Sequence, residues 1–286
     1  MSAADILAAM SAPPAFETEL PLERAPLPTT AEGWTEAIMQ GREVGPEGNL
    51  REIRDIGQTI RDVKAAFERL GESLAQFDKA QYFDSQNNLL QPGGQWKEYE
   101  ARFQALVERS EYKASAASAL LQQYDKAIMT DFDKSELPNV KHDLQAFGEK
   151  LGARRTDVKR IANEVEALGD DVRYFGAVID DDLRKAGRRI EEQYGNGSTQ
   201  QRSLAYHQGA VDSHRKDLDC AAQGARIISV IWSMIAADMH GYESQLSNAT
   251  DPDSPLTLKK IAMLRPTHGM LTAVCDILHN QARNQS

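Results

Sequence analysis

The sequence predicts an all-α protein, an elongated helical bundle that contains a long antiparallel coiled-coil hairpin. Three observations predict it. Apolar residues recur three and four positions apart through most of residues 50–283, which is the spacing of helices that pack along their whole length. No segment shows the alternation of apolar and polar residues that is typical of strands. Two helical stretches are also far longer than a compact globule of 286 residues is wide.

The chain divides into an arm, residues 1–49, and a bundle, residues 50–286. Prolines are frequent between positions 11 and 30 and glycines between 41 and 48, so we expect a mobile arm with a short helix around Trp34–Met39. Residues 1–10 form a short, interrupted apolar stretch without basic residues. We therefore expect cytoplasmic synthesis without a signal peptide, with any secretion by an unconventional route.

The bundle begins with two helices of moderate length. The first carries an unbroken apolar seam over positions 53–77. A break at 87–94 follows, and the second helix is expected to start near Trp96 and to reach residue 128. Small residues at 114–119 would let a neighbouring helix approach closely.

The next two helices are expected to form the long hairpin. Residues 139–194 keep a strict apolar seam over roughly 80 Å, and residues 199–248 over roughly 75 Å. The short turn 195–198 between them forces the two helices to lie antiparallel. A last helix is expected over 258–283, with a kink or break at Pro266.

The apolar stripe changes width along the second arm of this hairpin. Close to the 195–198 turn it is polar, with His207 and His214 at seam positions. Farther along it widens, because apolar residues crowd more than one face: Ile227, Ile228, Ile231, Trp232 and Ile235. A wide stripe needs several neighbours. We therefore expect a thick bundle at the end that contains 225–246 and a thinner two-helix projection that carries the turn as its tip.

The sequence offers no catalytic machinery. It lacks a Ser/His/Asp set, a phosphate-binding glycine loop after a strand and a CxxC pair. We therefore predict that the chain is not an enzyme and has no catalytic, cofactor-binding or metal-binding residues and no cofactor. It carries 33 basic and 43 acidic residues, a net charge of −10, which argues against a nucleic-acid partner.

One polar group lies within the seam near the tip. His207 and His214 face the same side, and Asp217 and Cys220 follow within two turns. Three interpretations stay open: polar residues that fix the helix register, which we favour, a zinc or copper site, and a pH switch. Cys220 and Cys275 are expected to be buried free thiols, with a disulfide between them as the alternative.

Charged clusters follow the long helix. Asp170–Asp171 and Asp180–Asp182 are similar to the aspartate-rich segments by which all-α terpene synthases bind magnesium diphosphate, but we interpret them as a solvated helix face. The basic clusters at 154–160 and 184–189 favour pairing with neighbouring carboxylates, and contact with anionic lipid is the alternative.

This organisation resembles the cytolysin A-like α-helical pore-forming toxins, including the haemolysin BL and xenorhabdolysin types. The resemblance covers residues 50–283 and includes an Ala-rich helix, followed by the Trp-bearing segment 225–235 that returns into the thick end. Members that enter membranes carry an apolar hairpin at the far end of the long helices. Here that position, 193–200, is short and polar. The resemblance thus implies a component without its own insertion hairpin that works with a partner chain, or the release of a segment such as 1–10.

We therefore expect a non-enzymatic, soluble helical protein that assembles on membranes as a toxin-like component. The expected partners are membrane lipid and a second protein component, in a homo- or hetero-oligomer. The alternative is a coiled-coil structural or scaffolding protein, or a BAR-like membrane-binding dimer. The net charge of −10 makes the basic concave face of a BAR-like dimer harder to build.

Overall fold

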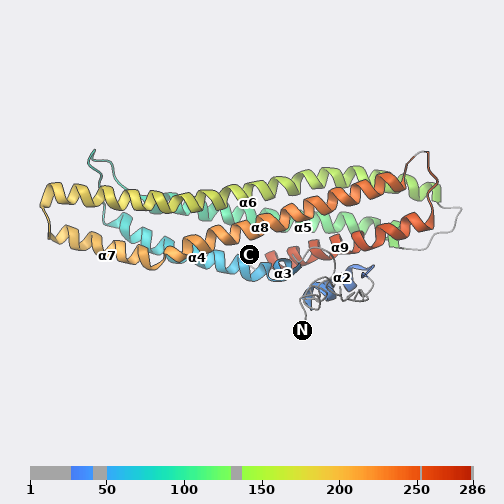
Figure 1. Cartoon of the computed structure of the whole chain (residues 1–286), viewed down its shortest axis with the longest axis horizontal. Helices are drawn as coiled ribbons and strands as arrows, with labels where there is room; N and C mark the ends of the chain where they lie inside the picture. The colour runs from blue at the N-terminus through green and yellow to red at the C-terminus, as the bar shows by residue number, and fades with distance from the viewer. Residues whose placement is uncertain (1–26, 41–49, 130–136, 252, 285–286) are drawn as a thin grey trace, which may run out of the picture.

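A computed structural model describes residues 27–40, 50–129, 137–251 and 253–284, and over these ranges the chain is helical apart from connecting loops and one isolated β-bridge. The prediction of an all-α, elongated helical bundle is confirmed (Figure 1). The helices are α2 (Ala31–Met39), α3 (Leu50–Arg54), α4 (Ile56–Lys79), α5 (Pro92–Met129), α6 (Leu137–Tyr194), α7 (Thr199–Ser213), α8 (Arg215–Ala249) and α9 (Leu258–Arg283).

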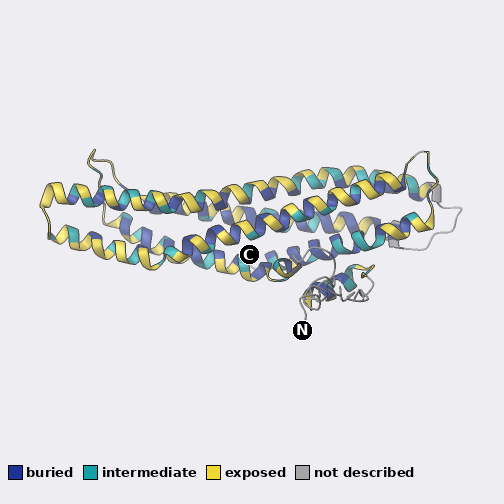
Figure 2. Ribbon diagram, viewed as in Figure 1, coloured by how far each residue is buried: buried dark blue, intermediate teal, exposed yellow. Residues whose placement is uncertain are grey.

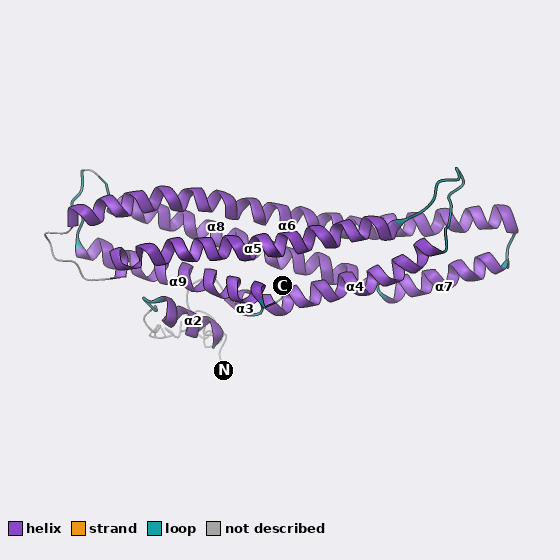
Figure 3. Ribbon diagram, turned by 180° about the vertical axis from the view of Figure 1, so that it is seen from behind, coloured by secondary structure: helices purple, strands orange, loops and turns teal. Residues whose placement is uncertain are grey.

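Four helix positions run along the rod. α6 spans its whole length, about 87 Å for 58 residues, and packs against α5 on one side and against α8 on the other. Successive long helices run in opposite directions (Figure 1, and from behind in Figure 3). The apolar seams of all four positions are buried against one another, and Figure 2 shows buried segments alternating with exposed ones along each long helix.

The fourth position, diagonal to α6, is shared by two helices from opposite ends of the sequence. α4 fills it along one half of the rod and α9 along the other half, and each packs against α5 and α8. Both run in the same direction, so the last turn of α9 meets the first turn of α4 near the middle. A helix C-terminus that faces a helix N-terminus places opposite partial charges together, which is favourable.

The long hairpin is present, but its second arm is not one helix. It is interrupted at His214, whose backbone (φ −108°, ψ 13°) leaves the helical region between α7 and α8. The Ser213 hydroxyl donates a hydrogen bond to the Ala210 carbonyl at 2.7 Å, and the Asp217 amide donates one to the His214 carbonyl. These local bonds replace regular helical ones, which the apolar spacing alone did not reveal.

Two other helix boundaries also differ from the prediction. The second helix begins at Pro92, four residues before Trp96, since proline suits the first helical position where no backbone N–H is needed. The last helix continues through Pro266 to Arg283 without a break. Buried residues on both sides of Pro266 hold it in place.

Only 27–40 of the predicted arm, residues 1–49, falls within the described residues. Its helix α2 packs on α9 and buries Trp34, Ala37 and Ile38. The backbone at Thr29 and Thr30 lies so close to Gly269 that a Cβ there would be 3.0 Å from the Thr30 carbonyl carbon, a tight contact. This part of the arm is therefore seated on the bundle, while 1–26, 41–49 and the segment 1–10 lie outside the described residues.

The bundle stays thick farther towards the tip than the sequence indicated. α4 and the loop after it run beside the hairpin as far as α7, where the Tyr82 hydroxyl lies 3.2 Å from that of Ser203. Tyr82 also contacts the ring of His207. Only the last turns around 195–198 project as two helices (Figure 1).

Candidate functional site: the tip of the rod

Four large exposed aromatic and apolar side chains belong to segments at the end of the rod that carries the 195–198 turn. They come from the loop after α4, the end of α6 and the start of α7 (Figure 1). Their exposed fractions are 40% for Phe83, 38% for Leu89, 50% for Tyr194 and 68% for Tyr206. We call residues 82–90 and 184–206 together the tip surface.

The loop part of the tip surface is a small hairpin. Phe83 and Leu89 form an isolated antiparallel β-bridge, and the Leu90 amide donates a hydrogen bond to the Tyr82 carbonyl at 2.9 Å. Side chains alternate across such a pair. Tyr82 and Leu90 accordingly point into the bundle, and Phe83 and Leu89 point outwards.

Asp84 holds the turn of this hairpin. Its carboxylate accepts hydrogen bonds from the Asn88 side chain at 2.9 Å and from the amides of Asn88 and Gln86, each at 2.8 Å. The Asn88 contacts hold the pKa of Asp84 below its usual value. This hairpin was not predicted from the sequence, because residues 82–90 have the composition of an ordinary break between helices.

The 195–198 turn is also closely tied. Gly195 and Gly197 both have positive φ, +73° and +78°, a conformation that glycine adopts without strain. The Ser198 hydroxyl caps α7 by accepting from the Gln201 amide at 3.2 Å. The tip is thus a fixed turn.

Replacing Gly197 by alanine should destabilise the protein by about 1 kcal/mol, because a Cβ strains this backbone although nothing crowds it. Gly148, in the interior of α6, is equally uncrowded and has no positive φ. Its replacement by alanine should stabilise the protein by about 0.5–1 kcal/mol. Thermal denaturation of the two variants checks both signs, and equal effects would contradict the turn geometry.

The tip surface is basic in an acidic protein. Residues 82–90 and 184–206 together hold five basic and three acidic side chains, a net charge of +2, whereas the chain as a whole carries −10. Arg184 and Lys185 pair with Asp181 at 3.5 and 2.6 Å, which confirms internal pairing for these two. Arg188 and Arg189 form no ion pair among the described residues, and Arg188 is exposed while Arg189 is half-buried.

A buried ionic network lies at the helix break. Asp217 is 1% exposed, and its carboxylate accepts from Arg69 of α4 at 2.6 Å and contacts His214 Nδ1 at 3.0 Å. Burial raises the pKa of Asp217, but the bonds from Arg69 and His214 outweigh it, so the net pKa lies below the usual value. The network ties α4 to the start of α8.

His207 and His214, which the sequence predicts on one apolar seam, have different partners in the structure. His214 joins the Arg69–Asp217 network, whereas His207 packs between Tyr82 and Tyr206, where burial lowers its pKa. Cys220 is half-buried, with its sulfur 3.8 Å from the Asp62 carbonyl. Over the described ranges, no group of three or more histidine, cysteine or acidic side chains is arranged to hold a metal ion.

Both cysteines are free thiols, and no disulfide joins them. Burial raises the pKa of Cys220, and it raises that of the fully buried Cys275 to about 12. The thiolate is the reactive form. Neither thiol is therefore activated at neutral pH.

The two aspartate clusters are engaged with basic side chains. Asp170 pairs with Arg173 and Asp171 with Arg102, and Asp181 pairs with Lys185. Asp180 pairs with Arg215 across the hairpin, and half-buried Asp182 has its pKa raised by burial. The aspartates therefore form a salt-bridged helix face.

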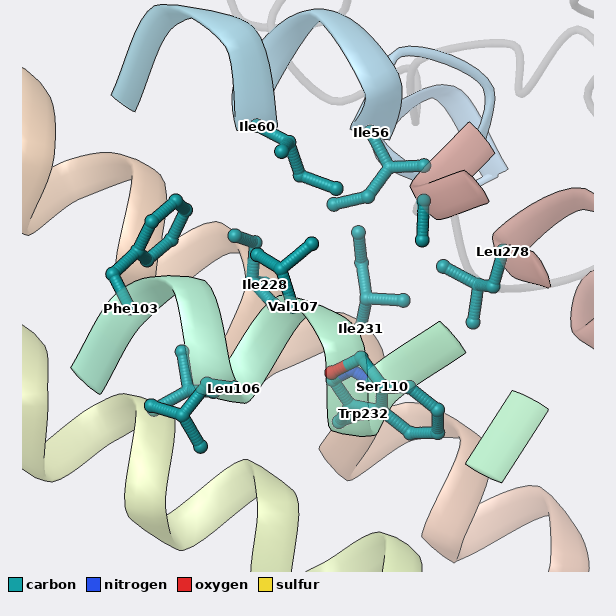
Figure 4. Close-up of a pocket in the computed structure, with 12 residues that line it drawn as sticks. Ile56, Ile60, Phe103, Leu106, Val107, Ser110, Ile228, Ile231, Trp232 and Leu278 are labelled. Atoms are coloured by element: carbon teal, nitrogen blue, oxygen red, sulfur yellow. The ribbon is translucent and has the colours of Figure 1, made fainter. Parts of the chain in front are cut away.

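A small apolar void marks the place where α9 meets α4 (Figure 4). It has about 20 Å³ of free space, enough for about one water molecule. Figure 4 shows Ile56 and Ile60 of α4, Leu278 of α9, and Ile231 and Trp232 of α8 around it. The Ser110 hydroxyl in its wall is buried and has no hydrogen-bond partner in the described part of the chain. The packing is thus incomplete at this junction.

Among the described residues, one helical stretch, Thr199–Ala249, has the length and apolar composition to cross a membrane. More than half of its most apolar part is buried inside the bundle. A core helix of a water-soluble bundle has the same composition. By itself, this stretch therefore does not indicate a membrane span.

Comparison of the chain with protein-family models, with curated proteins and with solved structures finds no match in any of the three.

Proposed function

We propose that this chain is a non-enzymatic helical protein that assembles on membranes, as a component of pore-forming toxin type that works with a partner chain. The observation that carries the proposal is the tip surface. It combines unpaired arginines with exposed aromatic side chains at one end of a rod. Aromatic rings favour the membrane–water interface, and basic residues bind anionic headgroups.

The tip surface is also built to keep its shape when it meets a bilayer. The Asp84 turn holds Phe83 and Leu89 outwards, and the glycines at 195 and 197 hold the end of α6 against the start of α7. A preorganised surface loses little conformational entropy on binding. The proposed role of the tip is therefore attachment to the headgroup region.

The architecture agrees with the resemblance in its long antiparallel helices and in the return of α8 into a multi-helix end. A BAR-like dimer receives less support, because it needs an exposed apolar face. Large exposed apolar side chains outside the tip surface are spread over several helices, such as Tyr112 on α5, Tyr174 on α6, Val230 on α8, and Leu258 and Met263 on α9. Such isolated residues are ordinary surface features.

Charge reversal at the tip tests the proposal. The double variant Arg188→Glu/Arg189→Glu should bind vesicles of anionic phospholipid at least about thirtyfold more weakly than the parent, at roughly 1 kcal/mol for each lost cation. The matched control Lys159→Glu/Lys259→Glu makes the same charge change on exposed residues far from the tip and should bind like the parent. Co-sedimentation measures binding, and release of a trapped dye measures permeabilisation.

Neutral vesicles complete the design, because the parent should bind them more weakly than anionic ones. The proposal fails if the parent, alone and with the partner chain encoded beside it, neither binds vesicles nor releases dye. If the control variant loses as much binding as the tip variant, the tip surface is not the part of the protein that binds the membrane.

A further inference from the structure

α9 combines a proline in its interior with buried polar atoms that lack hydrogen bonds. Pro266 lies in its interior and removes one backbone hydrogen bond. Two of its imidazole nitrogens, His268 Nε2 and His279 Nδ1, are buried without a hydrogen bond among the described residues. Their nearest carboxylates are Asp125 at 3.5 Å and Glu111 at 4.0 Å, too far for good hydrogen bonds. Unsatisfied buried polar groups weaken packing.

Within the described residues, α9 is joined covalently to the bundle through α8. It follows the polar connection 250–257 after α8, and its last turn stops at mid-rod against the first turn of α4. The junction holds the void and the unpartnered Ser110 hydroxyl. Within the described residues no covalent connection joins α9 to α4. α9 can therefore leave its place, with the loss of its contacts to α2, while the α6–α8 hairpin keeps its own packing.

The place that α9 leaves is an apolar groove specific for this helix. α5 lines it with small and apolar residues, α8 adds a second wall, and the start of α4 closes its end. The buried face of α9 extends over about six turns and is mostly apolar, with buried residues Ile261, Leu264, Leu271, Val274, Cys275, Ile277 and Leu278. A groove this long exposes too much apolar surface to stay empty in water.

We propose that copies of this chain associate by exchanging α9, so that α9 of one copy occupies the groove between α5 and α8 of another and ends against α4 of that copy. The interface reuses contacts already present in one chain, which makes exchange a low-cost route to an oligomer. The claim that this exchange is how the protein assembles on membranes rests on the proposed function. The exchange itself does not require a membrane.

Crosslinking between singly substituted chains tests the exchange. A Cβ on Gly57 of α4 would lie 3.5 Å from the Cβ of Gln281 in α9, within the range of a disulfide. Gly57→Cys and Gln281→Cys are made separately in a Cys220→Ser background, since Cys275 is fully buried. The two proteins are mixed, concentrated in solution or added to anionic vesicles, and oxidised. A 57–281 disulfide between two chains, identified by mass spectrometry, is the expected product.

A matched pair of positions controls for random collision. A Cβ on Gly169 of α6 would lie 3.4 Å from the Cβ of Ala225 in α8, within the hairpin that stays intact. Mixed Gly169→Cys and Ala225→Cys chains should give no more disulfide between chains than random collision does. The double variant Gly57→Cys/Gln281→Cys, oxidised while monomeric, should not associate, and reduction should restore association.

Each outcome decides between the proposals. Absence of the 57–281 product between chains, both in solution and on vesicles, overturns the exchange, as does normal association of the oxidised double variant. If the product forms in solution but no variant binds vesicles, the exchange stands and the proposed membrane function fails. If vesicles bind parent protein that yields only the disulfide within one chain, the membrane function stands and the exchange fails.

Discussion

Replacing Ile161 by aspartate is expected to unfold the bundle. Ile161 is 0% exposed in the α6 seam, near the middle of the rod where α5, α6 and α8 meet around the common axis. The substitution removes a buried aliphatic side chain and places an unpaired carboxylate among apolar groups. A loss of more than about 4 kcal/mol follows, a large share of the 5–15 kcal/mol that stabilises a typical domain. Helix content by circular dichroism against temperature measures it.

Two variants separate this effect from a general sensitivity of α6. Ile161→Leu keeps the volume and apolarity and should cost less than about 1.5 kcal/mol. Asp181→Asn, on the exposed face of the same helix, removes only surface ion pairs with Lys185 and Arg184 and should leave the melting curve unchanged. A large loss from Asp181→Asn would mean that the aspartate face is structural, contrary to our interpretation.

Acid is expected to weaken the bundle through His268. Burial lowers the pKa of His268 to about 4, although Asp125 acts in the opposite direction. The unfolded chain, with an ordinary histidine pKa near 6.5, then binds more protons than the folded chain between about pH 6.5 and 4. The free energy of unfolding should fall as the pH falls through this window, by about 3 kcal/mol from this residue.

The contribution of His268 is measured as a difference. Urea denaturation of the parent and of His268→Gln is compared at several pH values from 4 to 7. The variant should lack about 3 kcal/mol of the pH dependence, whatever its stability at pH 7. His240→Gln changes a histidine with an exposed side chain and should keep the full dependence of the parent. Parallel pH curves for the parent and His268→Gln would contradict the assigned burial effect.

Much of the fold could be predicted because long seams leave few alternatives. A strict spacing of three and four over more than fifty residues fixes both the helix and its buried face, and a four-residue turn between two such helices fixes their antiparallel packing. Seam residues such as Val158, Ile161, Val165 and Leu168 are indeed buried, each at 2% exposure or less. The wide apolar stripe of α8 likewise predicts that this helix is buried on more than one face, as the structure shows.

The remaining features depend on contacts between distant residues. The break at His214 leaves the apolar spacing intact, and it is stabilised by Arg69, which lies 148 residues away from Asp217 in the sequence. α4 and α9 share one position because they meet end to end. The spacing of apolar residues within either helix does not indicate which helix lies at its end. The tip hairpin is formed by polar bonds of Asp84 in a segment without periodicity. Of the candidate site, only the basic cluster at 184–189 could therefore be predicted from the sequence, because the other parts have no periodic pattern.

The collinear placement of α9 and α4 has a topological consequence. With α9 continued directly into α4, the rod would be an ordinary up-and-down bundle of four full-length helices, and the natural chain corresponds to a circular permutant of it that starts halfway along one helix. Both ends of the described helical region therefore lie on the flank of the rod. The end of the rod that carries 195–198 is formed by connections between helices alone.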